Sequence, residues 1–422
     1  MQRQLTASIE RHFSAVLAAG EAFFEKEAEA LATACWGMAR RFHAGGRLVI
    51  HAPQGAAYSD AQHNAVEYIH PVLVGKRALP AISVRDPRHL DLLCGPGDIA
   101  MALSEAGLTV SGETFGVPGA DPLVAQEVLE TAYHELWELV HVFFEHEGLL
   151  AEGCTEEVCV TCGDIALAAA VVRVSGTTAL VRTAQGEEEA DVSLVSPVAP
   201  GDLVMVHGGV ALDRVKPIEQ FSQEFYPFLT NEAVDVPTVL ADVAASVRMK
   251  WQEVAGLRRA QDLGVIAETL DAVAERVAAG GRILAFGNGG SATDSADLAA
   301  DLLDAGVGAM DLAGEPAVVT AIGNDIGFEE VFARQVIALG RAGDVAVGIS
   351  TSGRSGNIAR ALHQAHTQGM LTVGLAGYGG GALVGDAAVD HVIATDSTYI
   401  PRIQEAQATV YHALVRGLEA AT

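Results

Sequence analysis

Gly287-Asn288-Gly289-Gly290-Ser291 is the stretch of this 422-residue chain that decides its fold. It follows the apolar segment 283–286 and precedes residues that favour a helix. A second run of small and hydroxyl residues, 350–355, likewise follows an apolar segment, 345–349. A strand followed by a small-residue loop and a helix forms a cradle for phosphate, because backbone amides at the start of the helix point at the anion. The sequence therefore predicts an α/β domain that binds a small phosphorylated molecule.

Composition and charge argue against several classes of protein. Hydrophobic residues make up 50% of the chain and charged residues 19%, so a substantial core is available. Acidic residues outnumber basic ones 54 to 26, which argues against a nucleic-acid partner because such binding depends on clustered Lys and Arg. The sequence contains no apolar run typical of a membrane span, and its N-terminus has no signal-peptide core. We therefore expect a cytoplasmic protein without a membrane partner.

Two parts of the chain resemble each other. Residues 44–50 match residues 279–285, and residues 97–104 match residues 343–350. In each part a helical stretch leads through Gly-Gly into a strand, and a Gly-Asp turn leads into another strand. Strands that alternate with helices predict parallel sheets. We expect two doubly wound α/β domains of related topology, an N-terminal copy and a C-terminal copy.

The two copies differ at the loops that would bind phosphate. The N-terminal counterpart of the first loop, 52–56, contains Pro53, and the counterpart of the second loop, 104–107, contains Glu105. Proline removes an amide donor, and a glutamate repels phosphate. We therefore expect the N-terminal copy to have lost the phosphate site and to serve as a scaffold for packing, dimerisation or partner docking.

The region between the copies has a different pattern. Short apolar runs at 170–174, 178–182 and 203–207 are separated by turn signals such as Gly176. Several short strands in succession predict a small β-barrel. The fold class is thus α/β, with two doubly wound parallel-sheet domains flanking the barrel. The expected domains are the N-terminal copy at 1–150, the barrel at 151–217, and the C-terminal copy at 218–422 with a linker at 218–237.

Three of the five cysteines, Cys154, Cys159 and Cys162, lie close together in the middle region. An odd number of cysteines in a cytoplasmic chain does not suggest a disulfide framework. Cys159 and Cys162 form a CxxC pair, which indicates a redox pair or half of a zinc site, and Cys154 and His207 could supply further ligands. Ordinary surface thiols and a hydrogen-bonded core histidine remain the alternatives.

From Val239 onward the chain resembles the sugar isomerase (SIS) domain, specifically its phosphoheptose isomerase branch. The resemblance is carried by residues 287–292, 322–328, 343–344, 348–357 and 402–405. It implies that the second loop holds the phosphate, that the first loop approaches the sugar, and that the protein forms a homo-oligomer. The residues it assigns to phosphosugar binding are Asn288, Gly289, Gly290, Ser291, Asp325, Ser350, Thr351, Ser352, Ser355 and Gln404.

The catalytic positions depart from this family. The resemblance implies a glutamate on the helix after the glycine loop and a histidine on the C-terminal helix, which shuttle a proton between C1 and C2. The chain has Asp301 at the first position, and counting from Gln404 places Gln407 at the second. A family metal ligand, normally histidine, aligns with Asp297, and His412 is expected to face another way. Asp301 and Gln404 are the candidate catalytic residues. Binding without turnover is the alternative, and the two aspartates could also form a solvated helix face.

Residues 159–215 resemble the HypC/HupF family of nickel–iron hydrogenase assembly chaperones. The resemblance is carried by residues 162–166 and 201–211. It implies that Cys162 is a thiolate ligand of an iron fragment carrying cyanide and carbon monoxide, with His207 in support. The cysteine of typical members directly follows the initiator methionine, whereas here it is internal. The partners implied are the hydrogenase large subunit and an assembly scaffold.

Three functions follow from these resemblances. The first is an accessory protein of hydrogenase maturation, which joins an iron-handling chaperone barrel to a phosphosugar-binding module. The alternative is a ketose–aldose phosphosugar isomerase of the sedoheptulose 7-phosphate type, with the barrel as a docking tag. A third is a regulator that responds to sugar phosphates. No cofactor is certain from the sequence, and iron or zinc at the cysteines is the candidate.

Overall fold

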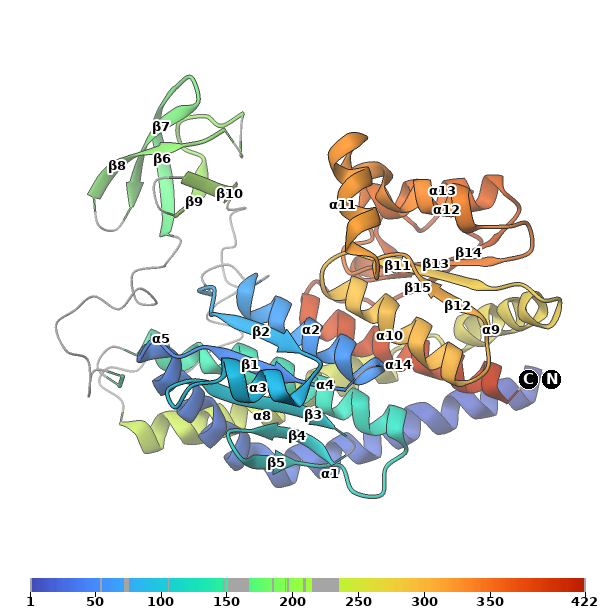
Figure 1. Ribbon diagram of the computed structural model, residues 1–422, viewed down its shortest axis with the longest axis horizontal. Helices are drawn as coiled ribbons and strands as arrows, with labels where there is room; N and C mark the ends of the chain where they lie inside the picture. The colour runs from blue at the N-terminus through green and yellow to red at the C-terminus, as the bar shows by residue number, and fades with distance from the viewer. Residues whose placement is uncertain are drawn as a thin grey trace.

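The structure, a computed structural model, describes residues 2–53, 55–71, 76–104, 106–146, 149–150, 167–183, 186–193, 195, 197–207, 210–214 and 235–420. Two α/β bodies lie side by side, in contact through helices α2 and α10, and a small body of strands is drawn apart from them (Figure 1). The expected α/β class, with two sheets that contain parallel strands, is confirmed.

The N-terminal copy has a five-stranded sheet of order β2-β1-β3-β4-β5. Strand β1 is parallel to β2 and β3, whereas β4 and β5 are antiparallel. The hairpin after β3 begins at Gly107, whose φ of +126° is a conformation open to glycine. A hairpin therefore stands where the C-terminal copy has a loop and a helix. The elements are α1 (Gln2–His43), β1 (Leu48–His51), α2 (Ala56–Ile69), β2 (Ala81–Val84), α3 (Pro87–Leu93), β3 (Ile99–Ser104), β4 (Gly107–Val110), β5 (Glu113–Phe115), α4 (Pro122–Val140) and α5 (Val142–Glu145).

The C-terminal copy has a fully parallel sheet of order β12-β11-β13-β14-β15. Its strands β13 and β14 are mostly apolar and buried along their whole length, since helices cover both faces of the sheet. The elements are α8 (Val236–Arg259), α9 (Leu263–Ala278), β11 (Ile283–Gly287), α10 (Gly290–Asp304), β12 (Ala309–Asp311), α11 (Pro316–Asp325), η2 (Phe328–Glu330), α12 (Val331–Leu339), β13 (Val345–Ser350), α13 (Gly356–Thr367), β14 (Leu371–Ala376), η3 (Tyr378–Gly380), β15 (His391–Ala394) and α14 (Ile400–Glu419).

The middle body consists of five strands that pair in the order β10-β8-β7-β6-β9. The order closes on itself because β10 pairs with β9 and, through the single pair Val210 and Asp191, with β8. Alanine and valine side chains fill its interior. The strands are β6 (Leu167–Ser175), β7 (Thr178–Thr183), β8 (Gly186–Asp191), β9 (Leu203–His207) and β10 (Val210–Arg214).

Helix α1 joins the two copies. Its apolar residues recur every three or four positions, which gives a long helix with one apolar stripe. Ile9 and Phe13 belong to the core of the C-terminal copy, whereas the stripe from Phe23 onward belongs to the core of the N-terminal copy. Helix α8 also packs into the N-terminal core, where a Cβ at Gly20 would lie 2.0 Å from the Trp251 ring. A glycine is needed there because the two helices cross so closely.

Helices α4 and α14 lie at the centre of the molecule. Almost every residue of both is buried, including the polar ones. Both begin at a proline in the first turn, and α4 is capped by Asp121, which accepts a hydrogen bond from the Leu123 amide. The contact between the copies is thus built around buried polar side chains.

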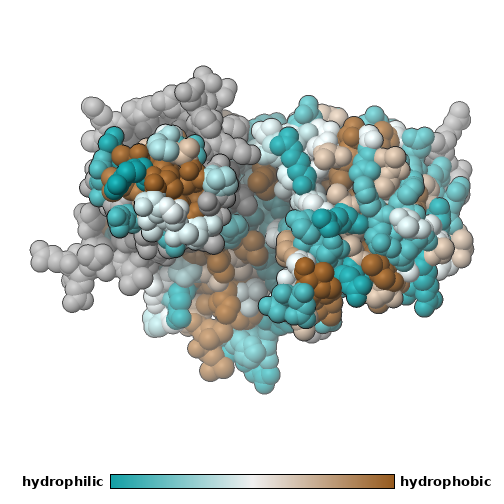
Figure 2. Space-filling model, turned by 90° about the horizontal axis from the view of Figure 1, so that it is seen from above, coloured by the Kyte–Doolittle hydropathy of each residue, from teal (hydrophilic) through white to brown (hydrophobic). Residues whose placement is uncertain are grey.

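The surface of the C-terminal copy is mostly polar. The face of the C-terminal copy seen in Figure 2 is largely hydrophilic, with separate apolar patches. In the described part of the chain, every helix is too short or too polar to cross a lipid bilayer.

Candidate functional site

The two predicted loops lie next to each other at the carboxyl ends of their strands. Strands β11 and β13 are neighbours, and their register pairs Gly287 with Ile349. Asn288 in the first loop and Asn357 in the first turn of α13 exchange two side-chain hydrogen bonds of 2.9 Å. These two hydrogen bonds hold the glycine loop against the start of α13, directly after the serine-rich loop.

The hydroxyls of the serine-rich loop fix its shape. Ser350 Oγ accepts a 3.1 Å hydrogen bond from the Gly353 amide and lies 3.1 Å from Ser355 Oγ. Ser352 Oγ accepts a 3.2 Å hydrogen bond from the Arg354 amide. Helix α13 begins directly after Ser355, so its first amides face this loop. The hydroxyl residues that stay partly exposed are Thr351, Ser352 and Ser355.

The glycine loop contacts the N-terminal copy. A Cβ at Gly290 would lie 2.1 Å from Gln404 Nε2 and 2.8 Å from His63 Nε2. A larger residue at position 290 would therefore force the Gln404 side chain or the loop to shift. Ser291 is buried behind the loop, and Gly289 caps α10 with a φ of +57°. Asp325, at the end of α11, is exposed and accepts a 2.8 Å hydrogen bond from Asn324.

A first group of buried polar residues lies beside the glycine loop. We call it the histidine cluster; its members are His63, Glu67, Glu130, His134 and Gln404. His63 Nε2 lies 3.4 Å from His134 Nε2, 2.9 Å from Gln404 Nε2 and 3.8 Å from Glu67 Oε1. His63, Glu130 and His134 each offer one possible metal-ligand atom, and these three atoms lie within 4.8 Å of one another.

A second group lies on α10, α14 and α4. We call it the aspartate cluster; its members are the buried residues Asp297, Asp301, Tyr411 and His412 and the half-buried Gln126. His412 Nε2 lies 3.2 Å from Asp301 Oδ2 and 3.6 Å from Asp297 Oδ2. Gln126 Nε2 and the Tyr411 hydroxyl donate to Asp297 at 2.7 and 2.9 Å. Asp297, Asp301 and His412 are also close enough to hold a metal ion.

The structure corrects the sequence-based position of the C-terminal histidine. His412 does point away from Gln407, as a spacing of five residues on a helix predicts. It is nevertheless His412, not Gln407, that faces Asp301. Neither polar atom of the Gln407 side chain has a hydrogen-bond partner among the described residues. Asp301 and Asp297 are buried within the aspartate cluster, so they do not form a solvated helix face.

The two clusters are related by a repeat in the sequence. Gln-Glu followed six residues later by Tyr-His occurs at 126–134 in α4 and at 404–412 in α14. Acidic or histidine residues recur with one spacing at 60, 63 and 67 in α2 and at 294, 297 and 301 in α10. His63, Glu67, Gln126 and His134 were missed by the sequence analysis, and this repeat is the signal that identifies them.

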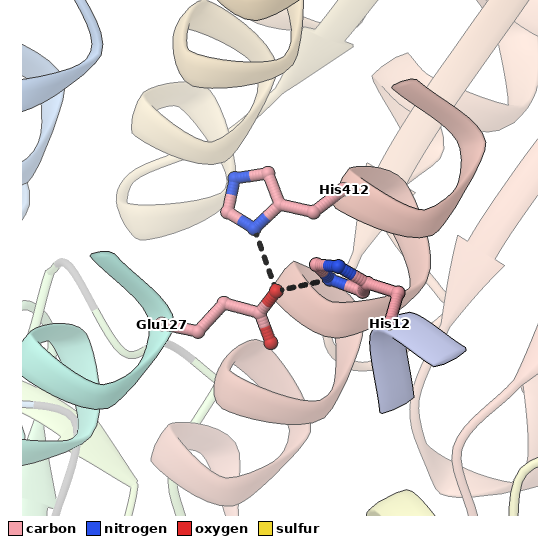
Figure 3. A group of neighbouring side chains, drawn as sticks. All are labelled: His12, Glu127 and His412. Carbon is pink, nitrogen blue, oxygen red and sulfur yellow. Dashed lines mark hydrogen bonds and ion pairs between the residues drawn. The ribbon is translucent and has the colours of Figure 1, made fainter. Parts of the chain in front are cut away.

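Each cluster takes side chains from both copies. His134 Nδ1 of the N-terminal copy lies 3.0 Å from Glu405 Oε1 of the C-terminal copy. Conversely, His412 Nδ1 lies 2.9 Å from Glu127 Oε1, which also lies 2.7 Å from His12 Nε2 (Figure 3). Gln404 reaches His63, as Gln126 reaches Asp297. The N-terminal copy therefore contributes side chains to both clusters.

Burial controls the charge of the histidine cluster. It lowers the pKa of His63 well below the ordinary histidine value and raises the pKa of Glu67 to about 8. Burial also raises the pKa of Glu130 well above the ordinary value. Burial thus disfavours the charged form of each of these three groups.

The aspartate cluster has the opposite electrostatics. Burial lowers the pKa of His412, but the carboxylates of Asp297, Asp301 and Glu127 around the ring outweigh this effect and raise the pKa well above the ordinary value. Burial likewise raises the pKa of Glu127, but the two histidines beside it outweigh this effect and lower the pKa below the ordinary value. His412 is therefore a buried imidazolium paired with ionised Glu127.

Comparison with known proteins places this site in a family. A SIS domain matches residues 252–377. The phosphoheptose isomerase of Paramagnetospirillum magneticum is 38% identical over 203 residues, which cover 47% of this chain and 97% of that relative. The chain belongs to the phosphoheptose isomerase family. The phosphoheptose isomerase of Roseiflexus sp. is 44% identical over 158 residues, covering 35% of this chain and 79% of that relative. The solved phosphoheptose isomerase of Neisseria gonorrhoeae is 35% identical, with a TM-score of 0.38, and covers 44% of this chain and 98% of that one.

The middle body has a family of its own. The HupF/HypC family matches residues 165–222, which confirms the second resemblance. His207 ends strand β9, where its backbone pairs with Val210. Cys154, Cys159 and Cys162 lie outside the described residues. The HupF/HypC segment thus lies between the two α/β copies of this chain.

Proposed function

We propose that the C-terminal copy binds a phosphorylated sugar across its glycine and serine-rich loops. The observation that carries the proposal is the junction of these loops at neighbouring strand ends, fastened by Asn288 and Asn357. Amides at the start of α13 and the hydroxyls of Ser350, Thr351, Ser352 and Ser355 supply donors to the phosphate. The net charge of −28 makes such local donors necessary, since the overall field repels an anion.

The sugar end of the ligand would extend from the phosphate along the glycine loop. Gly290 lies against Gln404 and His63, so these side chains close that end of the site. Asp325 and Ser291 remain proposed sugar contacts. Gln404 remains a proposed sugar contact, and we propose that the N-terminal copy adds His63 to the same end of the site.

Calorimetric titration with sedoheptulose 7-phosphate tests the binding proposal. Ser350→Ala should weaken the affinity by about 10-fold or more, because a hydrogen bond to a charged group is lost. Ser104→Ala is the matched control, since Ser104 is the counterpart of Ser350 in the N-terminal copy and should leave the affinity unchanged. Equal affinities of the two variants would refute the assignment of the phosphate to the serine-rich loop.

Isomerisation between ketose and aldose is a second candidate, favoured by the carboxylate of Glu67. This residue lies one helical turn after His63 and has one buried oxygen without a hydrogen-bond partner among the described residues. A base in that place could move a proton between C1 and C2 of a bound sugar phosphate. Incubation with sedoheptulose 7-phosphate in D2O should introduce deuterium at C2. Glu67→Gln should stop the exchange, whereas Asp301→Asn should retain it.

We also propose that the whole chain acts in hydrogenase maturation. The support is the HupF/HypC match over residues 165–222. The sequence resemblance at 162–166 extends it to iron handling at Cys162, with Cys159 and His207 as further candidate ligands. The proposed partners are the hydrogenase large subunit and an assembly scaffold. Cys162→Ala should abolish hydrogenase maturation in the native host. Cys94→Ala, a thiol in the N-terminal copy, is the control. Normal hydrogenase activity in the Cys162 variant would reject this role.

A further inference from the structure

A glutamate carboxylate lies against the start of helix α13, apart from both buried clusters. A Cβ at Gly356 would lie 2.2 Å from Glu329 Oε2 and 3.2 Å from Glu329 Oε1. Gly356 is the first residue of α13 and directly follows Ser355 of the serine-rich loop. The carboxylate therefore fills the space that a side chain at position 356 would occupy. This is the helix end at which the proposed function places the phosphate.

The short helix η2, which carries Glu329, packs against α13. Glu330, the next residue of η2, forms an ion pair with Arg360, one turn further along α13 than Gly356. Two residues further on, Phe332 is buried in the core of the C-terminal copy, where its ring stacks on Phe286 with the centroids 5.5 Å apart. These contacts hold η2 in place and thereby keep Glu329 at the start of α13.

The charge of Glu329 is not neutralised by a neighbouring side chain. Glu329 forms no hydrogen bond or ion pair with any described residue, whereas Glu330 beside it is paired with Arg360. The first turn of α13 contains no acidic residue, and the Ser355 side chain makes no capping hydrogen bond. Glu329 and a bound phosphate would therefore share one helix end, where their negative charges repel each other.

We propose that Glu329 is a specificity-determining residue, which restricts the site to phosphate monoesters by repelling a second phosphoryl group joined to the first. The inference rests on the proposed binding of a phosphosugar at the serine-rich loop. A monoester places one phosphate on that loop and its sugar toward the glycine loop. In a ligand joined through pyrophosphate, such as a nucleoside diphosphate sugar, the second phosphoryl group adds negative charge close to Glu329. The unpaired carboxylate thus selects by repulsion of the wrong ligand.

Calorimetric titrations of the full-length chain with inorganic phosphate and with pyrophosphate test this role, at one pH and without divalent metal ions. Glu329→Gln should raise the affinity for pyrophosphate relative to phosphate by about 10-fold, because one unit charge beside the ligand is removed. Glu268→Gln, at an exposed position of α9, makes the same change of charge away from α13. This matched control should leave the ratio of the two affinities unchanged.

Gly356→Ala displaces the same carboxylate without removing its charge. The new Cβ would meet the flexible end of the Glu329 side chain, so the chain should still fold and the affinity ratio should shift in the same direction. An unchanged ratio in Glu329→Gln, or an equal shift in Glu268→Gln, would overturn the inference. If phosphate binds and Ser350→Ala weakens its binding, that result removes only the role of Glu329. If phosphate binds to none of these chains, the proposed function fails and this inference fails with it.

Discussion

The histidine cluster and the aspartate cluster occupy equivalent positions in two copies of one fold, yet they have opposite internal chemistry. In the histidine cluster the nitrogens face each other and several buried oxygens have no partner. In the aspartate cluster three donors and an imidazolium surround Asp297. The aspartate cluster also holds two buried polar atoms without a hydrogen-bond partner among the described residues, Asp301 Oδ2 and His412 Nε2. The comparison teaches that equivalent positions in the two copies carry different side chains, two facing histidines in one cluster and a carboxylate surrounded by donors in the other.

The largest expected effect comes from removing the Glu127 carboxylate, which pairs with His412 of the aspartate cluster. Glu127→Gln leaves His412 and His12 without their shared carboxylate, so the free energy of unfolding should fall by about 3–5 kcal/mol. Chemical denaturation measures the change. Glu419→Gln, at the exposed end of α14, should cost less than about 1 kcal/mol. A loss that small in Glu127→Gln would mean that the pair of His412 with Glu127 contributes little to the stability of the protein.

The contact between the glycine loop and the histidine cluster can be broken by one methyl group. Gly290→Ala places a Cβ 2.1 Å from Gln404 Nε2, so the loop or the glutamine must move, at about 1–3 kcal/mol. Phosphosugar affinity should fall, as calorimetry can show. Gly256→Ala, in a helix with open space around that position, should be neutral or slightly stabilising. Unchanged phosphosugar binding in Gly290→Ala would mean that the contact of the glycine loop with Gln404 and His63 does not affect the ligand site.

The pH dependence of stability sharpens the comparison further. The folded-state pKa of His412 is raised, so its contribution is complete below the unfolded value near 6.5 and is lost as the pH rises toward the folded value. Between these pH values the free energy of unfolding should fall by up to about 1.4 kcal/mol per pH unit. Unfolding titrations from pH 6 to 9 would show this slope, and His412→Gln should remove it. An identical slope in both proteins would contradict a buried imidazolium.

The smallest expected effect concerns one hydroxyl. Tyr411→Phe removes a 2.9 Å hydrogen bond to Asp297 while other donors to that carboxylate remain, so stability should fall by about 1 kcal/mol. Tyr133→Phe, its counterpart in the repeat, removes a hydrogen bond to Asp60 and provides the matched comparison. Thermal unfolding can resolve both. A much larger loss for Tyr411→Phe would mean that the remaining donors do not satisfy the Asp297 carboxylate.

Local features of the site could be predicted from the sequence, whereas contacts between the copies could not. The glycine and serine-rich loops follow from residues adjacent in the chain, and both lie at neighbouring strand ends as expected. The contact of Gln404 with His63 joins residues 341 positions apart, and no spacing rule gives it. Counting along α14 from Gln404 selected Gln407 because a helix face is ambiguous without its partner, which here is Asp301. The repeated Gln-Glu and Tyr-His pairs of α4 and α14 would have identified His412 and His134 together.

Helix α1, which contributes to the cores of both copies, makes the two halves inseparable in one polypeptide. In a homodimer, paired sites dissociate on dilution and must be identical, since one gene encodes both. Here the effective concentration of one half for the other does not depend on protein concentration. A mutation also alters one half at a time, so selection can change a single cluster while the other stays constant. Covalent linkage of the copies is thus the condition under which two equivalent positions can acquire unequal chemistry.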